Sequence, residues 1–139
     1  QPDRGHGQHE QHRGRDYAEG ADGERRARFF ASHEGLHLDY ESSQTRQVPR
    51  RSGCYDLSTH FPWIGMRTAN PDGAHVEFMS GINNPIGLKC GPTMETDDLI
   101  RLIDKLNPEN APGRLTLITR MGAGVLGDRL PALARRVQQ

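Results

Sequence analysis

Short apolar runs, bounded by glycine, proline or charged residues, recur along the chain from about residue 28 onward. Runs with such boundaries are typical of short buried strands. The first of them is followed directly by His33 and Glu34, so we expect its carboxyl end to carry a carboxylate. Polar residues around Pro49 predict a loop over 41–53. The predicted strands are residues 29–32, 55–61, 86–89 and 114–120.

Helical spacing of apolar residues predicts helices between and after these strands. Residues 74–79 predict a short helix that ends near Gly81, with Asp72 as its cap. The next helix has Thr93 or Thr96 as a candidate N-cap and acidic residues in its first turn. Asn107 and Pro108 end it. Its predicted apolar stripe is Leu99, Ile100, Ile103 and Leu106.

A last amphipathic helix follows Gly124, and Pro131 is expected in its first turn, where proline is tolerated. Its predicted apolar face is Leu126, Leu130, Leu133 and Val137. The resulting alternation of strands and helices predicts an α/β fold with a parallel sheet. A barrel fits this order at least as well as a doubly wound sheet.

The length of 139 residues is too short for a closed eight-fold α/β barrel, which needs roughly 250 residues. We therefore expect a partial (β/α)8 barrel of about four central βα units over residues 28–139. Residues 1–27 are dense in glycine, glutamine, histidine and charged residues, with little to bury. This composition predicts a disordered tail.

Composition narrows the function classes. The 18 basic and 18 acidic residues cancel, which argues against a nucleic-acid-binding surface along the whole chain. Cys54 and Cys90 follow no zinc-binding spacing. No apolar run is long enough to span a membrane, and no phosphate-loop, dinucleotide or nucleophile-elbow motif is present. We expect a cytoplasmic protein.

Charged residues stand at the predicted carboxyl ends of the strands, namely Glu34, Arg67, Lys89 and Arg120. Because these ends share one face of a parallel α/β fold, the side chains should gather there. Three cations at one mouth indicate a small ligand with several negative charges. An arginine at a strand end is also common as a surface residue, and Glu34 could instead neutralise one cation.

Structural roles are expected for several other residues that are able to carry chemistry. We expect Cys90 to be a packing residue and Trp63 a wall or core residue. The histidines for which we expect structural roles are His33, His60 and His75.

The motifs resemble those of class II 3-deoxy-7-phosphoheptulonate synthases, over about residues 29–138. They occur in order and with matching spacing. The segments that carry the resemblance are 31–34 (ASHE), 38–41 (LDYE), 56–61 (DLSTHF), 63–65 (WIG), 67–68 (RT), 72–78 (DGAHVEF), 84–89 (NPIGLK) and 112–122 (PGRLTLITRMG).

The resemblance implies a transferase that catalyses the first step of the shikimate pathway, in aromatic amino acid biosynthesis. Such an enzyme condenses phosphoenolpyruvate with erythrose 4-phosphate and releases phosphate. It uses a divalent metal of the manganese or cobalt class, and a homo-oligomer is expected. By motif match, Arg67, Lys89 and Arg120 would hold phosphoenolpyruvate. Glu34 would position water, and Glu34 and Lys89 are the candidate catalytic residues.

Two departures from the family pattern matter. Met66 stands where the family usually has an acidic residue, and the family's metal ligands have no counterpart in this sequence. We therefore expect the phosphoenolpyruvate-binding half of an active site, and an isolated chain without activity. The alternatives are a non-catalytic or degenerate anion-binding fragment and, more distantly, another barrel enzyme that uses phosphosugars. No nucleic-acid or membrane partner is expected.

Overall fold

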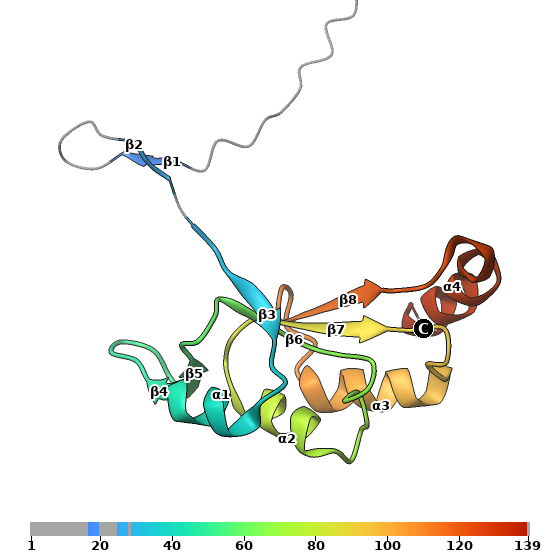
Figure 1. The fold of residues 1–139 in the computed structure, drawn as a ribbon, viewed down its shortest axis with the longest axis horizontal. Coiled ribbons are helices and arrows are strands. Elements are labelled where there is room, and N and C mark those ends of the chain that lie inside the picture. The colour runs from blue at the N-terminus through green and yellow to red at the C-terminus, as the bar shows by residue number, and fades with distance from the viewer. Residues whose placement is uncertain (1–16, 20–24, 28, 139) are drawn as a thin grey trace, which may run out of the picture.

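A four-stranded parallel sheet forms the centre of the fold (Figure 1). The computed structural model describes residues 17–19, 25–27 and 29–138. The sheet has the order β3-β6-β7-β8, and every neighbouring pair is parallel. The predicted α/β class with a parallel sheet is confirmed. The strands are β3 (Ser32–Glu34), β6 (Phe61–Ile64), β7 (Ile86–Cys90) and β8 (Leu115–Thr119).

The predicted tail is described only in two short pieces. Strands β1 (Tyr17–Glu19) and β2 (Arg25–Ala27) pair with each other in antiparallel fashion. The rest of the segment for which the sequence predicts disorder lies outside the described residues.

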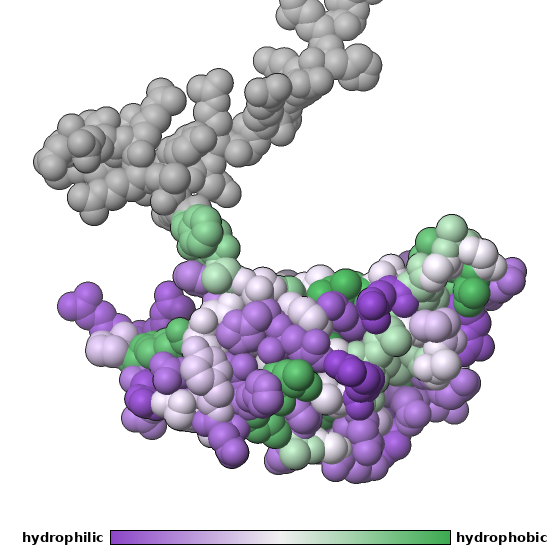
Figure 2. Space-filling model, viewed as in Figure 1, coloured by the Kyte–Doolittle hydropathy of each residue, from purple (hydrophilic) through white to green (hydrophobic). Residues whose placement is uncertain are grey.

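The first two strand predictions were wrong in position. Strand β3 begins at Ser32, and Phe29 and Phe30 before it are 87% and 68% exposed. The segment leading into β3 stands out as a hydrophobic projection in Figure 2. The second strand of the parallel sheet begins at Phe61, because Ser32 pairs with Phe61 in the register. Pairing with a neighbouring strand, rather than local hydrophobicity, therefore sets these boundaries.

Residues 41–53 do not form the single loop that was predicted. Helix α1 (Leu38–Gln44) occupies its start, and strand β4 (Thr45–Gln47) pairs in antiparallel fashion with β5 (Cys54–Asp56). The helix escaped prediction because Glu41, a charged residue, lies on its buried face with 2% exposure. Only residues 48–53 remain as the connection between β4 and β5.

Three further helices follow, α2 (Ala74–Gly81), α3 (Thr96–Leu106) and α4 (Ala123–Val137). The predicted caps were wrong, because Gly73 and Glu95 hold the N-cap positions and neither makes a side-chain cap bond. Asp72 instead pairs with Arg101 of α3 at 2.8 Å. Pro131 lies inside α4 rather than in its first turn.

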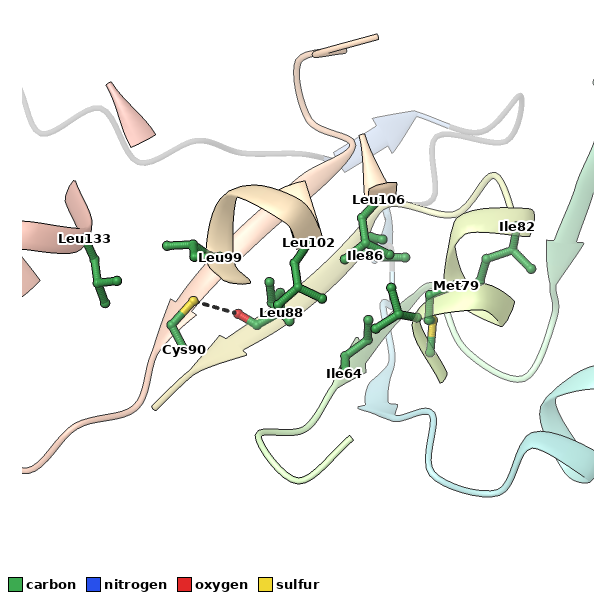
Figure 3. Packing of buried hydrophobic residues seen from close by; sticks show 11 residues of the cluster. Ile64, Met79, Ile82, Ile86, Leu88, Cys90, Leu99, Leu102, Leu106 and Leu133 are labelled. Carbon is green, nitrogen blue, oxygen red and sulfur yellow. Dashed lines mark hydrogen bonds between the residues drawn. The ribbon is translucent and has the colours of Figure 1, made fainter. Parts of the chain in front are cut away.

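The core lies between one face of the sheet and these helices (Figure 3). Leu102 of α3 is fully buried, although it was absent from the predicted stripe. On α4 only Leu133 is buried, and Val137 is 41% exposed. The buried cluster is Ile64, Val76, Met79, Ile82, Ile86, Leu88, Cys90, Leu99, Leu102, Leu106 and Leu133. Because strand side chains alternate between faces, the face opposite the helices is left to other residues, including Trp63 and Lys89.

Cys90 packs in this core, as predicted, and burial raises the pKa of its thiol from 9.0 to about 11. The folded state therefore favours the neutral thiol. The contribution of this neutral thiol to the free energy of unfolding is complete below pH 9 and is lost as the pH rises through about 11. We expect the thiol alone to lower the free energy of unfolding by about 2 kcal/mol at pH 11. Urea titrations at pH 8 and pH 11 should show a smaller decrease for Cys90→Ala than for the wild type.

Candidate anion-binding site

A pocket of about 450 Å³ opens at the carboxyl ends of the parallel strands. It contains all four of the predicted strand-end residues. Its lining is Glu34, Trp63, Gly65, Met66, Arg67, Lys89 and Arg120. The expectation that these charged side chains gather at one mouth therefore agrees with the geometry.

Glu34 reaches the pocket from the last position of β3. The next residue continues the sheet contact, since the Gly35 N–H donates to the Trp63 carbonyl at 3.0 Å. The Glu34 carboxylate lies against Gly65, where any Cβ would overlap Glu34 Oε1. Glycine at position 65 therefore leaves room for the carboxylate beside β6, and a side chain there would make the flexible end of Glu34 shift.

Arg67 is presented by a tight turn that follows β6. The Thr68 N–H and hydroxyl both donate to the Gly65 carbonyl, each at 3.2 Å. The turn leaves the Arg67 side chain exposed at the pocket. A guanidinium in this position can form two parallel hydrogen bonds with a phosphate or carboxylate.

Arg120 follows β8 directly. Its N–H donates to the Cys90 carbonyl at 2.8 Å, which extends the pairing of β7 and β8 by one residue. Its Nη1 lies 3.9 Å from Met66 Sδ, a weak acceptor. Met66 therefore contacts the guanidinium without neutralising it.

Lys89 belongs to β7, which lies between the strands that lead to Arg67 and Arg120. Its side chain is half-buried. Its Nζ sits 3.1 Å from the centroid of the Trp63 ring. Trp63 is thus a wall of the pocket, in line with the sequence expectation.

The pocket has one carboxylate against three cations. Among residues 29–138, neither Glu34 nor any of the three cations takes part in an ion pair. No ion pair among these residues therefore supports the alternative that Glu34 neutralises one of the cations. A cluster of cations that outnumbers its one carboxylate and forms no ion pair among these residues favours an anionic ligand, because most of its positive charge is not neutralised there.

The three histidines have structural partners, as predicted. His33 Nε2 lies 3.0 Å from the buried carboxylate of Glu41, which also accepts a 2.7 Å hydrogen bond from the Ser58 hydroxyl. His60 Nδ1 accepts the Ala31 N–H at 3.1 Å, and His75 Nε2 donates to the Leu36 carbonyl at 2.9 Å. These contacts anchor both ends of β3, the strand that carries Glu34.

Sequence reasoning missed Glu41. It belongs to the segment 38–41 that carries the family resemblance, and its three-residue spacing from Leu38 places the two side chains on one face once a helix is recognised.

No metal centre is found in the part of the chain that the structure describes. No group of three or more histidine, cysteine, aspartate and glutamate side chains there is close enough to hold an ion. Cys54 and Cys90 are both free thiols.

A second, larger cavity of about 780 Å³ lies near the amino ends of β6 and β7. It contains none of the predicted strand-end residues. Active sites of parallel α/β folds form at the carboxyl ends of the strands, so position rather than size identifies the smaller pocket as the candidate site. None of the described helices is both long and apolar enough to cross a membrane.

Comparison with known proteins gives one consistent family. The family described as "Class-II DAHP synthetase family" matches residues 11–139. This match begins earlier than the motif resemblance, so it includes part of the segment 1–27.

Three similar curated proteins share one enzyme name. The phospho-2-dehydro-3-deoxyheptonate aldolase of Streptomyces coelicolor is 51% identical over 109 residues, which cover 78% of this chain and 24% of that protein. The probable chloroplastic phospho-2-dehydro-3-deoxyheptonate aldolase of Catharanthus roseus is 47% identical over 110 residues, 79% and 22% of the two chains. The phospho-2-dehydro-3-deoxyheptonate aldolase AroG of Mycolicibacterium smegmatis is 46% identical over 117 residues, which cover 81% of this chain and 25% of that protein. The chain thus spans about a quarter of the length of these relatives.

Proposed function

Because the chain belongs to the class-II DAHP synthetase family, we propose that it supplies the phosphoenolpyruvate-binding half of a 3-deoxy-7-phosphoheptulonate synthase. Such an enzyme condenses phosphoenolpyruvate with erythrose 4-phosphate and releases phosphate. The observation that carries the proposal is a single pocket in which Glu34 lies with Arg67, Lys89 and Arg120.

Phosphoenolpyruvate matches the chemistry of this pocket. Its phosphate ester and its carboxylate are both attached to C2, so it offers two anionic groups a short distance apart. The planar forks of Arg67 and Arg120 suit bidentate contacts with such groups, and the ammonium of Lys89 supplies a compact charge between them. Fixed cations in a partly enclosed site stabilise charge without reorganisation.

Glu34 has a different role in the proposal. As the one carboxylate of the pocket, it repels the anionic groups of the substrate and can accept a hydrogen bond from water. We assign to it the positioning of the water that adds to C2 of phosphoenolpyruvate. Lys89 contacts the substrate beside that carbon.

The metal expected for this reaction does not fit the residues that the structure describes, since they contain no suitable group of ligands. We therefore assign no metal-dependent step to them. Their share of the chemistry is to bind the substrate, orient it and hold a water molecule.

We extend the proposal to the architecture. Residues 28–139 would form about four central units of an eight-fold barrel. The sequential order β3-β6-β7-β8, with α2, α3 and α4 packed on one sheet face, supports this reading. Under this proposal the opposite face, with the pocket at its edge, faces the barrel interior.

Isothermal titration of the chain with phosphoenolpyruvate tests the binding function. We expect saturable binding of one molecule per chain, tighter than the binding of inorganic phosphate, because the carboxylate adds a second anionic group. Absence of saturable binding at millimolar phosphoenolpyruvate would contradict the proposal. Equal affinity for the two ligands would favour the alternative of a general anion-binding fragment.

A phosphate-release assay tests the half-site claim. With both substrates and Mn²⁺, the isolated chain should release no phosphate, because the described residues offer no metal site. Metal-dependent release by the chain alone would contradict the division of the active site that we propose.

A further inference from the structure

Trp63 and Lys89 project from the same face of the sheet. Trp63 of β6 pairs with Gly87 of β7 in the parallel register, and Lys89 stands two residues beyond Gly87. Because side chains alternate between faces along a strand, positions 63, 87 and 89 share one face. The register therefore brings the Lys89 ammonium over the indole, 3.1 Å from the ring centroid.

Gly87 makes room for this arrangement. A Cβ at position 87 would lie 2.9 Å from both Trp63 Cβ and Ile118 Cδ1, which is closer than real Cβ contacts allow. Any side chain at this position would push Trp63 or Ile118 aside. The indole keeps its place beside Lys89 because the residue opposite it has no side chain.

The indole face differs from a carboxylate in what it does to the ammonium. A carboxylate would hold Lys89 but would occupy its N–H donors and compete with an incoming anion. An aromatic face attracts a cation through its quadrupole and accepts no full charge. In the described part of the chain Lys89 forms no ion pair. Its charge therefore stays available to the pocket while its long stem is restrained.

We propose that Trp63 is a positioning residue for Lys89, holding the ammonium in the anion pocket without neutralising it. The restraint lowers the conformational entropy that Lys89 loses when an anion binds. Trp63 acts through Lys89 rather than by contact with the reacting atoms. The identity of the ligand rests on the proposed function, whereas the contact between the two side chains does not.

Binding measurements give the first test. Calorimetric titrations with phosphoenolpyruvate should show affinity about tenfold weaker in Trp63→Leu and at most about threefold weaker in Trp63→Phe, since the smaller ring retains an aromatic face. Tyr55→Leu is the matched control, because it removes a second cation–π pair of the described residues, Arg51 on Tyr55, which lies away from this pocket. Affinity in a folded Trp63→Leu variant equal to that of the wild type would overturn the proposal.

Nuclear magnetic resonance of the lysine side chains gives a second readout, independent of any ligand. Lys89 and Lys105 are the two lysines of the chain, so ¹³C-lysine labelling yields two εCH₂ signals. The ring current of Trp63 should shift the Lys89 εCH₂ protons upfield of those of Lys105. We expect this shift to remain in part in Trp63→Phe and to vanish in Trp63→Leu.

The two readouts separate the possible failures. If the wild type binds no phosphoenolpyruvate but shows the upfield Lys89 signal, the proposed function fails and the positioning contact stands. If the Lys89 and Lys105 signals coincide in the wild-type chain, the positioning inference is wrong. This spectrum decides the matter even if Trp63→Leu does not fold.

Discussion

Lys89→Ala should weaken phosphoenolpyruvate binding about 30-fold, whereas Lys105→Ala should leave it unchanged. Hydrogen bonds to charged groups contribute about 1.5–3 kcal/mol each, and Lys89 lies in the same pocket as Arg67 and Arg120. Lys105 is a matched control of the same residue type. It belongs to α3, pairs with Glu77 at 2.8 Å and does not line the pocket.

Calorimetric titration of the two variants and the wild type checks this prediction, with circular dichroism to confirm that each is folded. Equal affinity of Lys89→Ala and Lys105→Ala would show that the pocket cations do not hold the ligand. Arg114 is unsuitable as a control for the arginines. It is half-buried and donates to the carbonyls of Asn84 and Met79, and burial lowers the pKa of its guanidinium. Its removal would therefore disturb the fold.

Leu102→Ala should reduce the free energy of unfolding by about 3 kcal/mol, because it leaves a cavity in the centre of the core. Leu102 is fully buried among the residues of the core cluster. Ile100→Ala on the same helix should cost less than about 1.5 kcal/mol, since Ile100 is only half-buried and lies outside that cluster.

Urea unfolding followed by circular dichroism measures both values. The comparison tests which face of α3 meets the sheet. A larger loss for Ile100→Ala than for Leu102→Ala would mean that the helix is rotated relative to the structure, with the face that contains Ile100 buried.

Strands 7 and 8 of the fold could be predicted closely from the sequence. Both are apolar runs between glycine or proline residues. The observed strand Ile86–Cys90 is one residue longer at its carboxyl end than predicted, and Leu115–Thr119 is one residue shorter at each end. Glu34 was placed correctly at a strand end although the strand itself was misplaced. The predicted strand ended at residue 32, and the observed strand extends two residues further, so that Glu34 is its last residue.

The elements that sequence reasoning missed depend on contacts between distant segments. The buried face of α1 includes Glu41, whose carboxylate is held by His33 and Ser58, so no apolar pattern marks the helix. Strand β6 contains Pro62, and the predicted strand stopped at Phe61, the first residue of β6. It is a strand because both of its neighbours pair with it.

The candidate site was predictable in its members but not in its internal geometry. Strand ends and motif resemblance identified Glu34, Arg67, Lys89 and Arg120. The stacking of Lys89 on Trp63 depends on the register of β6 and β7, which a single sequence does not specify. The absence of ion pairs at the three cations within residues 29–138 likewise became visible only in three dimensions.

A crystal structure of the chain with phosphoenolpyruvate tests the central claim most directly. We predict the ligand in the pocket at the carboxyl ends of the strands, with its phosphate and carboxylate oxygens within hydrogen-bond distance of Arg67, Lys89 and Arg120. Ligand bound instead in the larger cavity near the amino ends of β6 and β7 would contradict it, as would a saturated crystal with this pocket empty.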